Sequence, residues 1–213
     1  KQKDVLMQQR LPEIYKDIQF SDLKVFECLL KFLPKRSNLH MGNSSVVRYC
    51  QLFDPKTSVR YFSNRGTSGI DGCTSTACGS ALMNRKKFNI LISGDVSFFY
   101  DSNALWSNHL PGNLRIIVIN NNGGGIFKII DGPSSVKQMN TYFEARHEYS
   151  AEHLCTTFNI DYFVAETIDE IKNVIDTFFM DSENDRPRLM EINTPPEINH
   201  LALNDFFDLA QSS

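Results

Sequence analysis

The chain has 213 residues, and its 41% hydrophobic content is enough apolar material for one well-buried core. Its 22 basic and 25 acidic residues leave a formal charge of −3, which argues against a mainly electrostatic attachment to nucleic acid or to an anionic membrane. No apolar run approaches the ~20 residues of a membrane-spanning helix, and no signal segment is visible. Five cysteines without a CxxC pair favour reduced thiols, so we predict a cytoplasmic protein.

Helical and strand-like patterns alternate along the chain. In chain order we predict a helix within 4–32, a strand over 38–41, a helix capped by Asn43 or Ser44, a strand over 59–62, a helix over 74–83, a strand over 88–92, a helix reaching about 109, a strand over 114–119, a helix capped by Ser150 and ending at 158, a helix over 168–179, and a strand over 188–192 before Pro195 and Pro196. This alternation predicts an α/β fold, a doubly wound and mainly parallel sheet with helices on both faces.

We divide the chain into residues 1–35, which form a helical lead-in or the end of a preceding connector, and residues 36–213, which form the domain itself. The first residue is Lys1 rather than a methionine. We therefore expect the sequence to be part of a longer protein.

Polar and glycine-rich loops follow two successive predicted strands. Asp95 stands between a strand and a helix, where a carboxylate can hold a hard cation or cap the helix. Asn122 follows the next strand and precedes three glycines, a pattern that is also typical of a flexible turn. If the strands are adjacent, the Asp95 carboxylate, the Asn122 side-chain oxygen and a glycine carbonyl can form part of the octahedral oxygen shell that Mg²⁺ prefers.

Four segments taken together carry a more specific signal. They are GNSSVVR (42–48), SNRGTSGIDG (63–72), GDVSFFYDSNAL (94–105) and NNNGGGIF (120–127). In this order they resemble the family of 2-succinyl-5-enolpyruvyl-6-hydroxy-3-cyclohexene-1-carboxylate (SEPHCHC) synthases, and the last two form the GD…NN motif of thiamine-diphosphate enzymes. The resemblance spans roughly residues 38–165. It implies that residues 36–213 are a domain that binds thiamine diphosphate and Mg²⁺, with Mn²⁺ as a substitute.

The resemblance also implies roles for individual residues. The metal ligands would be Asp95, Asn122 and the Gly124 carbonyl. The cofactor would contact Ser68, Ile70, Gly94, Asp95, Ser97, Asn122, Gly124, Gly125, Ile126 and Phe127, and Ile70 would support its bent conformation. Substrate carboxylates would be recognised by Ser44, Arg48 and Arg65, although each arginine taken alone is more readily structural or solvated. We further expect helices that follow Gly69 and Gly94 to direct backbone N–H groups at the diphosphate.

In the family, the reaction decarboxylates 2-oxoglutarate on thiamine diphosphate and adds the resulting succinyl carbanion equivalent to isochorismate during menaquinone biosynthesis. The glutamate that activates the cofactor belongs to a separate N-terminal domain. We therefore assign no catalytic residue to this chain and predict that it is inactive alone. The resemblance implies that full-length chains form a homodimer or homotetramer, with no nucleic-acid partner and no membrane span.

Two alternatives stay open: a domain of another thiamine-diphosphate decarboxylase or carboligase, and a noncatalytic nucleotide-binding α/β module. The glycines at 66, 69 and 72 lack the GxGxxG spacing of a dinucleotide site. The five histidines contain no HExxH pattern, and Ser68 does not lie in a GxSxG turn. Zinc catalysis and serine hydrolysis are therefore not predicted.

Overall fold

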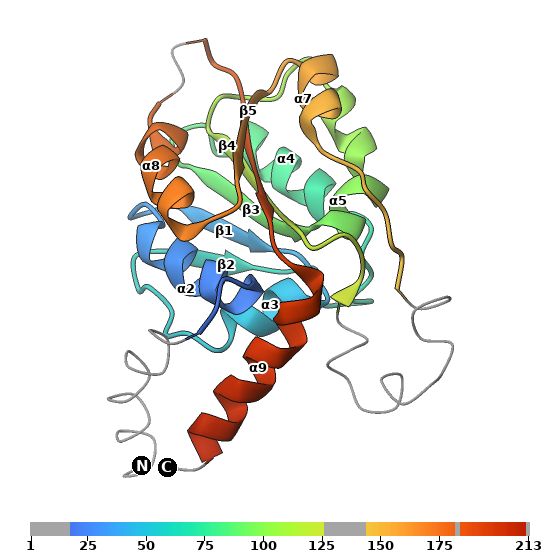
Figure 1. The fold of residues 1–213 in the computed structure, drawn as a ribbon. Helices are drawn as coiled ribbons and strands as arrows, with labels where there is room; N and C mark the ends of the chain where they lie inside the picture. The colour runs from blue at the N-terminus through green and yellow to red at the C-terminus, as the bar shows by residue number, and fades with distance from the viewer. Residues whose placement is uncertain (1–17, 126–143, 182–183, 212–213) are drawn as a thin grey trace.

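The computed structural model describes residues 18–125, 144–181 and 184–211. Its centre is a six-stranded sheet in the order β2-β1-β3-β4-β6-β5, in which every neighbouring pair is parallel (Figure 1). The strands are β1 (Asn38–Met41), β2 (Arg60–Phe62), β3 (Asn89–Gly94), β4 (Leu114–Asn120), β5 (Asp161–Ala165) and β6 (Arg188–Asn193). The predicted α/β class and parallel sheet are confirmed.

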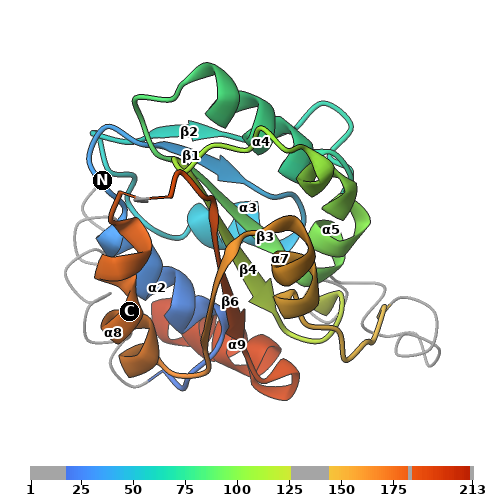
Figure 2. The same ribbon diagram turned by 90° about the horizontal axis from the view of Figure 1, so that it is seen from above.

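Helices cover both faces of the sheet (Figure 2). One face packs against α2 (Asp22–Phe32), α3 (Ser45–Cys50), α8 (Ile168–Phe179) and α9 (Pro196–Gln211). The other packs against α4 (Cys73–Met83), α5 (Asp95–Tyr100), the 3-10 helix η1 (Ser102–Trp106) and α7 (Glu152–Phe158). The fold therefore has three layers, with the sheet in the middle.

The central strands are buried on both faces because their side chains alternate between the two helical layers. In β4, Ile117 and Ile119 pack toward α2 and α8, whereas Ile116 and Val118 pack toward α4 and α7. All four are at most 2% exposed. Burial of each side chain stabilises the fold by about 1.5–3 kcal/mol, which explains why β4 reads as an almost continuous apolar run.

Local sequence signals set several helix boundaries. Helix α8 has the predicted bounds, and its N-cap Thr167 accepts a hydrogen bond from the Glu170 N–H. Helix α2 begins at Asp22 after the N-cap Ser21, while residues 4–17 of the predicted helix lie outside the described residues. Leu23 and Val25 of α2 are fully buried in the core that covers the sheet, and the division of the chain at residue 35 stays a prediction.

Two described elements were missing from the sequence prediction. Strand β5 lies at the edge of the sheet and is only partly buried, so it lacks the long apolar run of β4. Helix α9 begins at Pro196, because proline is well tolerated at the first helical position, where its missing N–H removes no helical hydrogen bond. In the sequence the proline pair had indicated an end rather than a beginning.

The topology produces a switch in strand order at the centre of the sheet. The chain leaves β1 for β2 on one side and then returns to β3 on the other. Such a switch point opens a crevice outside the carboxyl ends of the parallel strands, where α/β sheets commonly bind ligands. None of the helices in the described ranges is long and apolar enough to cross a membrane.

Candidate cofactor site

A cavity of about 290 Å³ lies at the carboxyl ends of β1, β3 and β4, at the switch point. The residues that line it come from the ends of these strands and the loops after them, from α2, α3 and α5, from the loop before α4 and from position 145. They are Asp22, Phe26, Asn43, Ser44, Ser45, Val46, Ile70, Gly94, Asp95, Val96, Ser97, Tyr100, Ile119, Asn121, Gly123, Gly124, Gly125 and Ala145. The loops that carry the GD…NN motif therefore meet in one place.

Asp95 is the first residue of α5 and is only 3% exposed. Its Oδ1 accepts the Val96 N–H at 2.7 Å, and its Oδ2 accepts the Gly123 N–H at 2.9 Å. Burial raises the pKa of Asp95, and the backbone hydrogen bonds and nearby His147 partly oppose that rise. A divalent cation would strongly favour the charged carboxylate.

His147 contacts the same carboxylate from a distant part of the sequence. Its Nε2 lies 3.2 Å from Asp95 Oδ2 but without the alignment of a hydrogen bond. The imidazole ring stacks on Tyr149 with a centroid separation of 5.1 Å and packs edge-on against Phe99. These contacts hold the ring beside Asp95. Sequence reasoning missed His147, because no local motif surrounds it.

The glycine loop is held by its backbone. Asn122 has φ 61°, donates its N–H to Asn120 Oδ1 at 3.1 Å and accepts the His147 N–H at 3.3 Å. Gly123 has φ 139°, and a Cβ atom there would lie 3.1 Å from the Ala145 carbonyl oxygen. Glycine is therefore required at 123 both for its backbone conformation and for the close approach of residues 145–146.

Asp22 brings a second carboxylate to the cavity, and the sequence analysis did not predict it. The side chain is 3% exposed, and burial raises its pKa to about 6, with a further contribution from the charge of Asp95. Its Oδ2 accepts from Asn121 Nδ2 at 3.0 Å, and its Oδ1 accepts from the Thr194 hydroxyl at 2.6 Å. Its own N–H donates to Asn199 Oδ1 at 2.8 Å.

Asn43 ties the loop after β2 to the cavity. Its Nδ2 donates to the carbonyls of Asn64 and Gly69 at 3.0 and 2.6 Å, and its Oδ1 accepts from Arg65 Nη1 at 3.0 Å. The prediction that Asn43 or Ser44 caps α3 with its side chain was wrong. Ser44 occupies the N-cap position with φ 67° but makes no side-chain cap bond. The Asn43 side chain binds the loop after β2 instead. Ser150 likewise stands one residue before the N-cap Ala151, although its hydroxyl accepts the Glu152 N–H.

The predicted site residues divide into three groups. Ser44, Ile70, Gly94, Asp95, Ser97, Gly124 and Gly125 line the cavity, and the buried Ser97 hydroxyl donates to the Ile70 carbonyl at 2.5 Å. Ser68, Asn122, Arg48 and Arg65 are exposed and do not line it, whereas Asn121 does. Ile126 and Phe127 lie outside the described residues. The binding roles given to all these residues stay predictions.

A side chain of the protein already occupies part of the N-terminus of α4. The helix begins at Cys73, one residue before the predicted start. The Ser75 N–H donates to Asp101 Oδ2 at 2.7 Å, and the Ser75 hydroxyl donates to the other carboxylate oxygen. The Ser75 N–H is therefore satisfied by the buried Asp101, and the expectation that other N–H groups of this helix end face the diphosphate stays a prediction.

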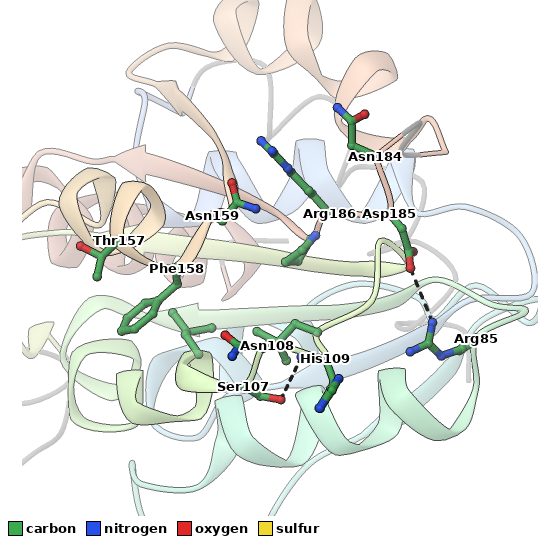
Figure 3. Close-up of a pocket in the computed structure, with 13 residues that line it drawn as sticks. Arg85, Ser107, Asn108, His109, Thr157, Phe158, Asn159, Asn184, Asp185 and Arg186 are labelled. Carbon is green, nitrogen blue, oxygen red and sulfur yellow. Dashed lines mark hydrogen bonds and ion pairs between the residues drawn. The ribbon is translucent and has the colours of Figure 1, made fainter.

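A larger cavity, of about 780 Å³, opens at the opposite edge of the sheet, just before β4, β5 and β6 begin (Figure 3). Arg85 Nη1 lies 3.5 Å from Asp185 Oδ2 across it. None of the predicted cofactor residues lines this cavity. Size alone therefore does not identify the site, and position at the strand carboxyl ends favours the smaller cavity.

The donor atoms of the smaller cavity suit a hard cation. Oxygen ligands are those that Mg²⁺ prefers, and the cavity offers the Asp95 carboxylate together with Asn121 Oδ1, which is buried without a hydrogen-bond partner among the described residues. Three or more His, Cys, Asp or Glu side chains do not gather as a metal site in the described ranges. A cation here would thus depend on amide and carbonyl oxygens and on the ligand's own phosphate.

Comparison with known proteins agrees with this geometry. The model of the family described as "Thiamine pyrophosphate enzyme, C-terminal TPP binding domain" matches residues 40–192, a range that contains β1, Asp95 and the glycine loop. The chain belongs to this family. Membership supports the predicted thiamine-diphosphate cofactor and places the chain among the domains of enzymes.

Several curated relatives of this family domain are named 2-succinyl-5-enolpyruvyl-6-hydroxy-3-cyclohexene-1-carboxylate synthase. The protein of Christiangramia forsetii is 45% identical over 205 residues, which cover 96% of this chain and 35% of that protein. The Flavobacterium johnsoniae protein is 45% identical over 89% of the chain and 34% of its own length, and the Porphyromonas gingivalis protein is 41% identical over 90% and 33%. The chain thus spans about a third of the length of these relatives.

Proposed function

We propose that the chain is the cofactor-binding domain of a SEPHCHC synthase, a transferase that decarboxylates 2-oxoglutarate and joins the remaining succinyl unit to isochorismate in menaquinone biosynthesis. The names of the relatives support this reaction. The observation that carries the cofactor role is the buried Asp95 carboxylate, which lies against the glycine loop in a cavity at the switch point of the sheet.

Mg²⁺, or Mn²⁺ in its place, would be held by Asp95, the Gly124 carbonyl and an asparagine side-chain oxygen. The family resemblance assigns that oxygen to Asn122, whereas Asn121 is the asparagine whose side chain lines the cavity. Alanine substitution of each asparagine distinguishes the two. Substitution of the asparagine that binds the metal should raise the Mg²⁺ concentration needed for cofactor binding more than substitution of the other asparagine does.

The protein's own groups would position the cofactor and neutralise its charge. Thiamine diphosphate supplies the group that stabilises the carbanion formed on decarboxylation. Gly94 and the N-terminus of α5 lie beside Asp95, so the metal and the backbone would share the diphosphate charge. Ile70 and Phe26 line the same cavity and would exclude water from the bound cofactor.

Substrate carboxylates would be recognised at the rim of the cavity. Ser44 lines the cavity itself, and Arg65 is tethered to it through the hydrogen bond to Asn43. Arg48 of α3 lines a separate hollow together with Leu203 and Phe207, so its proposed contact with a substrate has less support than that of Ser44. A guanidinium pairs well with a carboxylate through two hydrogen bonds.

The complete protein would act in the cytoplasm as a homodimer or homotetramer, with the cofactor-activating glutamate in a separate N-terminal domain. All five cysteines are buried and free, which suits a reducing compartment. This assignment predicts that the chain alone is inactive. A second domain must cover the side of the cofactor that this chain leaves open.

The test is product formation from 2-oxoglutarate and isochorismate. The complete protein that carries this sequence should form SEPHCHC with thiamine diphosphate and Mg²⁺, and the 213-residue chain should not. Turnover of 2-oxoglutarate with a different acceptor would favour another carboligase. Tighter binding of ATP or NAD than of thiamine diphosphate would favour a noncatalytic nucleotide-binding module.

A further inference from the structure

The cavity contains a carboxylate that the cofactor assignment does not explain. Asp22 lies at the N-terminus of α2, far from the GD…NN motif in sequence, yet it lines the same cavity as Asp95. Among the described residues, the Asn121 amide and the Thr194 hydroxyl donate to its carboxylate, the Asn199 side chain also stabilises its charged form, and no lysine or arginine pairs with it. Two buried carboxylates thus share one cavity, and the described residues that line this cavity include no lysine or arginine.

Such an arrangement is unfavourable for the fold alone. A buried carboxylate without a cationic partner loses hydration, and a neighbouring negative charge adds repulsion. Asparagine or threonine at position 22 would satisfy the Thr194 hydroxyl without this penalty. The presence of an aspartate at position 22 is therefore better explained by a cation that binds in the cavity than by the packing of α2.

Asp22 also determines how Asn121 is oriented. A charged carboxylate accepts hydrogen bonds but does not donate them, so it fixes the Asn121 Nδ2 side of the amide toward itself. The other end of that amide, Oδ1, is left buried without a partner in the described part of the chain. The Asn121 backbone also helps to lower the pKa of Asp95, so this residue lies between the two carboxylates.

We propose that Asp22 is a positioning residue of the cation site, which orients the Asn121 amide so that its oxygen is available to a divalent cation and which adds negative charge behind Asp95. The inference rests on the proposed function, because it concerns the cation that accompanies thiamine diphosphate. Outer groups that orient metal ligands typically change metal affinity or activity by about 10–100-fold when they are replaced.

The substitution Asp22→Asn tests this role with little change of shape. The Thr194 hydroxyl donates to position 22, so the new side chain keeps its oxygen toward Thr194 and places its NH₂ group opposite Asn121 Nδ2. The Asn121 amide then turns its oxygen toward position 22. The cation would then meet an NH₂ group and one negative charge fewer. Asp101→Asn is the matched control, because Asp101 is equally buried at 2% exposure and caps α4 away from the glycine loop.

The experiment measures the Mg²⁺ concentration that gives half-maximal thiamine-diphosphate binding, by calorimetry on the complete protein, together with the melting temperature of the metal-free protein. We expect Asp22→Asn to raise that concentration at least about tenfold without lowering the metal-free melting temperature. Asp101→Asn should leave it within about twofold. Thr194→Val, which keeps the carboxylate and its contact with Asn121, should also leave it within about twofold.

The outcomes separate this inference from the proposed function. An unchanged Mg²⁺ requirement in Asp22→Asn, beside Mg²⁺-dependent binding in the parent protein, overturns the role of Asp22 and leaves the proposed function standing. Equal effects of Asp22→Asn and Asp101→Asn, or a metal-free Asp22→Asn protein that does not fold, show a structural role and also overturn the inference. Absence of Mg²⁺-dependent binding in the parent protein overturns both.

Discussion

Replacement of Asp22 by asparagine should make the metal-free protein more stable, and the gain should depend on pH. Burial raises the pKa of Asp22 from its ordinary value of 3.8 to about 6, so the folded protein binds this proton more tightly than the unfolded chain does. The stability that comes from the protonated side chain is fully present below about pH 4. It is lost as the pH rises through about 6.

The size of the effect follows from the shift. A difference of about two pKa units corresponds to about 3 kcal/mol between the protonated and charged forms, at 1.36 kcal/mol per unit. For a domain of this size, that free energy corresponds to roughly 6–12 °C in melting temperature. The asparagine side chain of the variant cannot ionise. The variant and the parent should therefore melt at similar temperatures near pH 4, and the variant should melt higher at pH 7.

Thermal unfolding of both metal-free proteins between pH 4 and pH 7.5 measures this difference. Titration of groups other than Asp22 largely cancels when the two curves are subtracted, except for the coupling between Asp22 and Asp95, which belongs to the same effect. A difference in melting temperature that stays constant over this range would refute the reasoning. It would mean that Asp22 does not become charged in the folded protein between these pH values. Addition of Mg²⁺ should reduce the advantage of the variant.

Three further predictions concern other parts of the structure. Gly123→Ala should lower the free energy of unfolding, measured in urea, by about 1–3 kcal/mol and weaken cofactor binding, because residue 123 has φ 139° and packs on Ala145. The control Gly79→Ala lies on the exposed side of α4 with no atom near the new Cβ, so it should be neutral or stabilising. Glu191→Gln should lower the free energy of unfolding by about 1–3 kcal/mol in the same assay. The buried carboxylate accepts hydrogen bonds from Asn120, Ser150 and Tyr162, and the NH₂ group of glutamine would face one of these donors. Full stability of the variant would contradict this. Burial raises the pKa of Cys50, Cys78 and Cys155 to about 12, so these thiols should resist alkylation at pH 8 in the native protein and react after unfolding, and rapid native labelling would be inconsistent with the packing.

The sequence predicted those parts of the fold whose signal is local. Helix α8 combines an apolar stripe with a Thr167 cap, and β4 is a continuous apolar run, so both were placed within a residue of their bounds. Strand β5 and helix α9 were missed because an edge strand carries a weak pattern and because proline both ends and begins helices.

The candidate site shows the same division. Asp95 and the glycine loop were predicted because strand-to-helix junctions and glycine runs are visible along the sequence, and the topology brings them together. Asp22 and His147 were not predicted, because each approaches the cavity from a distant element and carries no motif of its own. The role of Asn43 was also misassigned, since a side chain that can cap the next helix can equally bind a neighbouring loop.

The central claim is that the cavity at the ends of β1, β3 and β4 holds thiamine diphosphate through a divalent cation at Asp95. Calorimetric titration of thiamine diphosphate into the complete protein, with and without Mg²⁺, tests it most directly, with Asp95→Ala compared with Asp101→Asn. We predict binding that requires Mg²⁺, is lost in Asp95→Ala and persists in Asp101→Asn, with both variants folded by circular dichroism. Mg²⁺-dependent binding that survives in Asp95→Ala would contradict the account.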